Sequence, residues 1–139
     1  MATQKPTALG YAEIAKRMGT AGDGTGSCVK KIVGLSGACT AAEASTFLNP
    51  GGATKLADNG FAIVDATTVK TSKTTVDDDT VEVNHVFTTK TASQKTTGFA
   101  IINADADVAF MEACYAAEIP TEVADTVTLV AKMQFKLGA

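Results

Sequence analysis

Residues 125–137 read DTVTLVAKMQFKL, and this stretch decides the fold class. Apolar side chains occupy every second position from Val127 to Leu137, and the positions between them are polar except for Val130. A period of two places alternate side chains on opposite faces of a β-strand. The pattern therefore predicts a half-buried strand with one face toward a core and the other toward solvent.

Similar apolar segments, bounded by Gly, Asn, Asp and Pro, occur upstream of this strand and predict further strands. Residues 108–117 are ambiguous because their alanine content also suits a helix, and we favour a strand because short connections between neighbours favour hairpins. Pro120 is expected to end that segment before the last strand. These strands predict one mainly β domain, an antiparallel β-sandwich. The other expected strands cover residues 29–35, 60–69, 80–88 and 99–102.

The first 26 residues have a different pattern, and we expect them to form a separate arm before a sandwich of residues 27–139. Residues 1–6 are interpreted as a tail or an arm. Tyr11, Ile14 and Met18 have helical spacing, and Thr7 can cap that short helix. Residues 19–26 contain four glycines but lack the Gly-Lys-Ser/Thr ending of a phosphate-binding loop, so a flexible connector is the better interpretation. Residues 40–43, TAAE, match a capping box and predict a second short helix reaching residue 48.

Composition limits the function. The chain of 139 residues fits one domain, and its 24 Ala, six Phe, two Tyr and no Trp predict a thin core that favours oligomers. A net charge of −3 argues against nucleic-acid binding. No apolar run approaches the ~20 residues of a membrane helix. Residues 1–5 lack the apolar core of a signal peptide, so we expect synthesis in a cytoplasm without export by the usual route.

Candidate chemical groups are few, and we expect no catalytic, cofactor or metal site. His85 is the single histidine, and no motif supplies a nucleophile and an orienting carboxylate for it, so a structural or rim position is expected. Residues 77–79, three aspartates, do not match a calcium loop and are interpreted as a solvated turn.

The three cysteines, Cys28, Cys39 and Cys114, lack the spacing of a zinc site. Three interpretations stay open. They are small buried thiols, a Cys28–Cys39 bridge, or a disulfide between subunits.

Four short motifs occur in order along the chain: GYAEIA at 10–15, IVG at 32–34, GFAIIN at 98–103, and the alternating strand from Asp125 to Phe135. Together they resemble the small structural proteins of tailed bacteriophages. The resemblance implies a β-sandwich that assembles on a virion made in the host cytoplasm. Its partners would be further copies of itself and other virion proteins, such as the major capsid or tail proteins.

Within that family, the expected role is a non-enzymatic, multimeric capsid decoration or cement protein. We expect the 1–26 arm to reach a neighbouring subunit, with Tyr11, Ile14 and Met18 as its contacts. A tail tube, collar or fibre-base component is the first alternative. A binding module that recognises a sugar or host surface is the second, although such modules usually present aromatic platforms.

Overall fold

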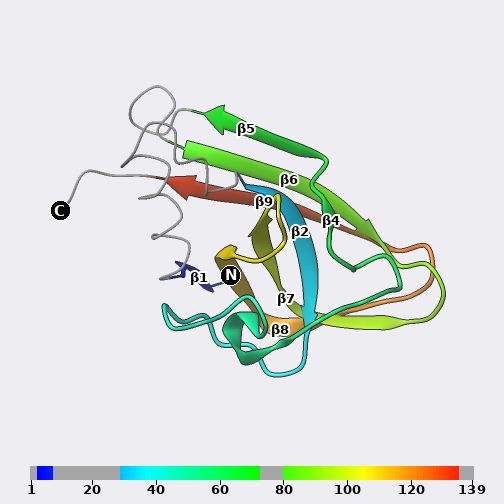
Figure 1. Ribbon diagram of the computed structural model, residues 1–139. Helices are drawn as coiled ribbons and strands as arrows, with labels where there is room; N and C mark the ends of the chain where they lie inside the picture. Colours follow the sequence, from blue (N-terminus) through cyan, green and yellow to red (C-terminus); the bar gives the residue numbers. More distant parts are fainter. Residues whose placement is uncertain (1–2, 8–28, 73–79, 135–139) are drawn as a thin grey trace, which may run out of the picture.

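The computed structural model describes residues 3–7, 29–72 and 80–134, and within these ranges all strand pairs are antiparallel (Figure 1). The large sheet has the order β1-β8-β7-β2-β3, with β4 also paired to β2. Its strands are β1 (Thr3–Pro6), β2 (Val29–Ser36), β3 (Thr54–Lys55), β4 (Val64–Asp65), β7 (Gln94–Asn103) and β8 (Ala109–Thr121). The small sheet has the order β5-β6-β9, with strands β5 (Thr68–Ser72), β6 (Thr80–Thr88) and β9 (Thr126–Gln134).

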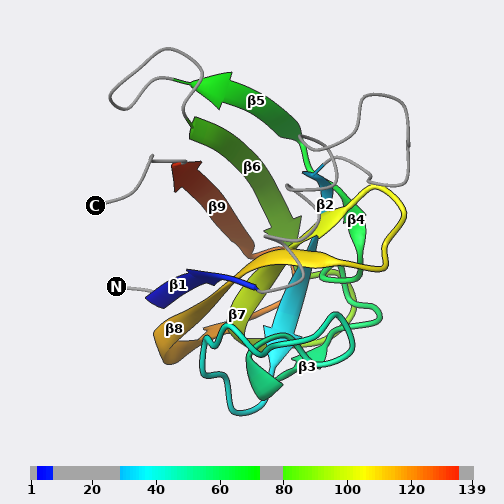
Figure 2. The ribbon, with the colours of Figure 1, turned by 60° about the vertical axis from the view of Figure 1, so that its left-hand side comes forward.

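The two sheets form two layers, and Figure 2 shows β5, β6 and β9 of the small sheet above β1, β8 and β7 of the large one. The mainly β, antiparallel sandwich predicted from the sequence is therefore confirmed. The short 3-10 turn η1 (Pro50–Gly52) is the one helical element within the described ranges. None of the helical structure in those ranges could cross a membrane.

The main core lies between the sheets. Phe61 and Phe87 stack there with ring centroids 5.1 Å apart. The last strand follows its predicted alternation, because Leu129 and Ala131 are buried while Val130 is 55 % exposed. The buried members of this core are Ile32, Phe61, Val83, Phe87, Phe99, Ile101, Met111, Ala113, Leu129 and Ala131.

A second, smaller core lies on the opposite face of the large sheet. It forms because β2 and β7 are apolar on both faces, so a covering layer is needed on each side. The covering layer is the segment 37–53, drawn in cyan and teal below β2 and β8 in Figure 1. The buried residues of this core are Val33, Leu35, Ala53, Ala100 and Ile102.

Several predicted strands are confirmed with small changes of length. The segments 29–35 and 80–88 are β2 and β6. The segment 99–102 lies inside the longer β7, and the ambiguous residues 108–117 are a strand, most of β8.

The single strand predicted for residues 60–69 is wrong. The chain passes from one sheet to the other there, because β4 pairs with β2 in the large sheet and β5 pairs with β6 in the small one. Phe61 is buried from the loop that precedes β4. Its apolar neighbours therefore belong to a crossover rather than to one strand.

Pro120 does not end β8, contrary to expectation. It lies within the strand, opposite Lys95 of β7. β1 pairs with β8 between Met111 and Cys114, so among the described strands the part of β8 around Pro120 has a neighbour only on the β7 side. An edge strand tolerates proline because no neighbour needs its missing N–H.

The amino terminus also differs from the predicted tail. Residues 3–6 are β1, which pairs with β8, and the next residue, Thr7, donates its backbone N–H to Phe110 O at 3.1 Å and its hydroxyl to Ala109 O. The predicted helix with Tyr11, Ile14 and Met18, the glycine-rich segment 19–26 and the turn at 77–79 all lie outside the described residues.

Candidate functional site

A hollow with a volume of about 470 Å³ opens where the β3–β4 loop meets the end of β6. We call it the His85 groove. One wall is the turn Asp58–Gly60 and a second is the apolar pair Ile63 and Val64. The third runs along the end of β6 from His85 to Thr88 and continues to Lys90. It therefore joins residues that are 21 to 32 positions apart in the chain, from Val64–His85 to Asp58–Lys90.

Asn59 makes this groove rigid. Its side-chain Oδ1 accepts hydrogen bonds from the backbone N–H groups of Lys90 and Thr91 at 3.1 and 2.8 Å, and its Nδ2 donates to Ala92 O at 2.7 Å. Asn59 has a φ of 54° and Gly60 a φ of 88°, backbone conformations that suit these two residue types. The turn is thereby clamped to the segment that follows β6.

Gly60 is required at this contact for a steric reason. A Cβ atom at this position would lie 1.9 Å from the carbonyl oxygen of Thr88. The backbones of the turn and of β6 can approach this closely only without a side chain between them.

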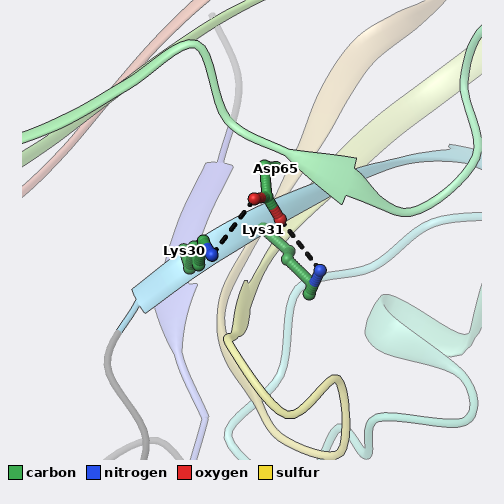
Figure 3. Close-up of polar contacts among 3 residues, drawn as sticks. All are labelled: Lys30, Lys31 and Asp65. Atoms are coloured by element: carbon green, nitrogen blue, oxygen red, sulfur yellow. Dashed lines mark hydrogen bonds and ion pairs between the residues drawn. The ribbon is translucent and has the colours of Figure 1, made fainter.

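The β4 wall is held by charge as well as by strand pairing. Asp65 Oδ1 accepts a hydrogen bond from Lys31 Nζ at 2.8 Å, and Asp65 Oδ2 lies 3.2 Å from Lys30 Nζ (Figure 3). Hydrogen bonds from Lys31 and then Lys30 lower the pKa of the Asp65 carboxyl below its ordinary value. These contacts hold the two-residue strand against β2, although each exposed ion pair contributes little by itself.

His85 lies at the rim of the groove, as expected, with its ring partly buried. Its Nδ1 is 3.2 Å from Thr67 Oγ1, and its ring meets Phe87 edge-on with centroids 4.6 Å apart. Burial lowers the pKa of His85 below its ordinary value of 6.5, so the imidazole is neutral at pH 7. These contacts orient the ring as part of the wall.

The remaining lining combines exposed apolar groups with unpaired charges. Ile63, Val64 and Val86 keep 36–44 % of their surface exposed and face this one hollow. Asp58 and Lys90 carry opposite charges, and neither side chain bonds to another part of the described chain. A groove of this kind suits an apolar group flanked by charges.

A second anchored feature is the segment 37–53, which we call the Leu48 loop. Cys39 forms a disulfide with Cys114 of β8, so the Cys28–Cys39 bridge, one of the three interpretations that the sequence left open, is wrong. The loop folds over the large sheet and brings Cys39 onto β8, whereas Cys28 lies outside the described residues. A thiol consumed in one bridge is not available for the other.

Glu112 is the second anchor of this loop, and sequence reasoning missed its role. It is fully buried, and its Oε1 accepts hydrogen bonds from Ala42 N and Ser45 Oγ, each at 2.7 Å. The helix predicted from residues 40–43 is absent, since residues 40–49 contain only turns, bends and irregular backbone. One signal in the sequence could have indicated this role, because Glu112 is the single acidic residue within the otherwise apolar run 108–114.

The tip of the Leu48 loop is braced and carries an exposed leucine. Lys55 donates a hydrogen bond to Phe47 O at 2.6 Å and lies 3.4 Å from the centre of the Phe47 ring. The next residue, Leu48, is 73 % exposed, more than any other large apolar side chain in the described ranges. The loop thus presents one apolar side chain from a fixed position.

No protein-family model, no curated protein and no solved structure matches this chain. Within the described ranges, no three His, Cys, Asp or Glu side chains gather as a metal site would require. The His85 groove and the Leu48 loop are therefore the features from which a function can be argued.

Proposed function

We propose that this protein is a non-enzymatic structural component of a tailed-phage virion, in which it decorates the capsid as a homo-oligomer. The four ordered motifs from residue 10 to residue 135 support the virion assignment. The observation that supports assembly is the groove in which Ile63, Val64 and Val86 stay exposed together. Contiguous apolar surface of this kind, with charges at its edge, is typical of sites where proteins associate.

The mechanism would be burial of apolar surface between copies, and between the oligomer and the shell. A standard interface of ~1,600 Å² repeated many times on a particle makes individually weak contacts add up. The thin core also favours assembly, because surface buried between subunits stabilises the fold. The partners are further copies and the major capsid or tail proteins, without nucleic acid or membrane.

The test is the native mass of the purified protein by light scattering, followed by electron microscopy. A defined oligomer of the 14.2 kDa chain is expected, together with saturable binding to empty phage shells. Stacked rings would instead assign it to a tail tube or collar. A monomer that binds host cells but not shells would overturn the proposal and favour a surface-recognition module.

A further inference from the structure

We infer that the Cys39–Cys114 disulfide is a redox switch that controls whether the Leu48 loop covers the large sheet. In the oxidised protein the loop is held against β8, and after reduction it lifts off as one body while the sandwich stays folded. This inference goes beyond the proposed function and does not depend on it. Two features of the loop support it, its few bonds to the sheet and a buried carboxyl oxygen beneath it.

The Leu48 loop is bonded mostly to itself. Thr40 donates its backbone N–H to Gly51 O at 2.8 Å, and Gly51 donates its own N–H to Ser45 Oγ at 3.1 Å. Three more backbone bonds inside the loop join Ser45 to Ala42, Gly52 to Asn49 and Ala53 to Pro50. A loop with these internal bonds can leave the sheet without losing its own structure.

The disulfide and Glu112 tie the loop to β8. Glu112 Oε1 accepts the hydrogen bonds of Ala42 N–H and the Ser45 hydroxyl, and Cys114, two residues along the same strand, forms the bridge. Lys55 binds Phe47 O, but it lies on β3 just after the loop and does not connect it to β8. No other hydrogen bond or ion pair joins residues 37–53 to the rest of the described chain.

The loop also buries little apolar surface of its own. The buried side chains of the smaller core belong to β2 and β7 except for Ala53, and Cys39 and Phe47 pack against them only partly buried. An open hollow of about 540 Å³ is lined by residues of the loop alone, so part of the loop is not packed against the sheet. Hydrophobic burial therefore contributes less to closure of the loop than to the main core.

Closure leaves one polar atom in an unfavourable environment. Glu112 Oε2 is buried and has no hydrogen-bond partner among the described residues, although Oε1 accepts two hydrogen bonds. A buried polar atom without a partner costs free energy, and water removes that cost once the loop lifts. Hydration of Glu112 thus offsets part of the bonds lost to Ala42 and Ser45. The disulfide is the tie that decides between the closed and the open loop.

The switch operates by thiol–disulfide exchange with a dithiol reductant. Cys39 is partly exposed whereas Cys114 is only 6 % exposed, so a thiolate of the reductant attacks the sulfur of Cys39. A mixed disulfide forms, the Cys39–Cys114 bond breaks, and Cys114 leaves as a thiolate that takes up a proton. The second thiol of the reductant then closes the reductant's own disulfide and releases Cys39, which is protonated. Two electrons and two protons pass from the reductant to the bridge, and a disulfide oxidant reverses the reaction.

Release of the loop uncovers the outer face of the large sheet. Val33, Leu35 and Ile102 are fully buried beneath the closed loop and come into contact with water when it opens. Oxidation covers them again. Reducing surroundings therefore select a form with an exposed apolar face, and oxidising surroundings select the form in which that face is hidden.

The experiment measures cleavage of the full chain by a glutamate-specific protease, with and without dithiothreitol. Glu43 is the single glutamate of the Leu48 loop and is exposed. Cleavage after Glu43 should be at least about 30-fold faster in the reduced protein, the ratio that corresponds to the lower end of the stabilisation typical of a disulfide. Mass spectrometry of the denatured, reduced digest identifies the fragments, and oxidised glutathione should restore slow cleavage.

Two variants and one internal site are the controls. Cys39→Ser has no bridge, so cleavage after Glu43 should be fast with and without dithiothreitol. Cys28→Ser keeps the bridge and should respond to dithiothreitol as the wild type does. Glu82 lies within β6, so cleavage after Glu82 requires the sandwich to unfold and should stay much slower than cleavage after Glu43 in the reduced protein.

Amide NMR spectra separate release of the loop from unfolding of the chain. In the reduced protein, the signals of Thr40 and Ala42 should move toward random-coil positions, whereas those of Leu129 and Ala131 in β9 should keep theirs. A reduced protein in which Glu43 stays protected would overturn the inference, because the remaining contacts would then suffice to close the loop. Collapse of the β9 signals would also overturn it, because the bridge would then hold the whole fold. Neither result bears on the proposed function, which the native mass tests.

Discussion

Cys39 and Cys114 are 75 residues apart in the sequence, yet their Cα atoms lie 5.5 Å apart and a disulfide joins them. The bridge ties the Leu48 loop to β8. Gly51 packs directly over it, with a φ of 63°, and a Cβ atom there would lie 2.9 and 3.0 Å from the two sulfurs. The loop, the strand and the glycine turn therefore form one packed unit.

Reduction of the disulfide is expected to lower the free energy of unfolding. A bridge that closes a long loop restricts the unfolded chain, and its loss typically costs about 2–4 kcal/mol. Denaturant unfolding with and without reductant measures the change, and Cys114→Ala should reproduce it without reductant. A reduced protein as stable as the oxidised one would contradict this role.

Cys28→Ser provides the control for the pairing. Because Cys39 and Cys114 are joined, the oxidised Cys28→Ser protein should contain no free thiol under denaturing conditions and should keep the stability of the wild type. If Cys39 were instead paired with Cys28 in the wild type, this variant would contain two free thiols, at Cys39 and Cys114.

Glu112→Ala is expected to destabilise the protein by about 1–3 kcal/mol, because it leaves the part-buried Ala42 N–H and Ser45 hydroxyl without the side chain that accepts hydrogen bonds from both. Denaturant unfolding measures the loss. Glu118→Ala is the matched control on the same strand. Glu118 is half exposed and pairs with Lys95 at 2.7 Å, so its removal should leave unfolding nearly unchanged. Equal effects of the two substitutions would show that Glu112 does not anchor the loop.

Gly60→Ala is expected to cost about 3 kcal/mol or more, because it combines a left-handed backbone with a clash against Thr88 O. Gly37→Ala separates the two causes. Gly37 has a similar φ of 82° but open space around the Cβ position, so strain alone should cost about 1–2 kcal/mol. Thermal or denaturant unfolding compares them, and a Gly60→Ala protein no less stable than Gly37→Ala would rule out the close approach.

Acidification should destabilise the wild type through His85. Burial lowers the pKa of its imidazole, so between the folded pKa and the unfolded value near 6.5 the unfolded chain binds the extra proton. The stability that the folded state gains from a neutral His85 ring is fully present above pH 6.5. It is lost as the pH falls through the pKa of the ring in the folded protein. Unfolding of the wild type and of His85→Gln between pH 7.5 and 5 measures the difference, and NMR titration of the ring gives the folded pKa directly. Parallel pH profiles for the two proteins would count against a buried neutral ring.

The sequence by itself determined the strands whose side chains alternate. β9 and β6 were found because a period of two is a local property of an extended backbone, readable from Leu129 and Ala131 without knowledge of any partner. The same locality explains why the single strand predicted for residues 60–69 is wrong. An apolar run has the same sequence pattern whether the chain crosses between two sheets or stays within one.

Only the tertiary structure decided which distant residues meet. Glu112 reaches Ala42 across 70 positions and Asn59 reaches Thr91 across 32, and no periodic pattern encodes such pairs. Cys39 had two possible partners in the sequence, and the covering of the large sheet by the Leu48 loop selected Cys114. Local backbone geometry sets the faces of a strand, whereas packing of the whole chain sets what each face touches. The His85 groove and the Leu48 loop, on which the function is argued, are products of the packing of the whole chain.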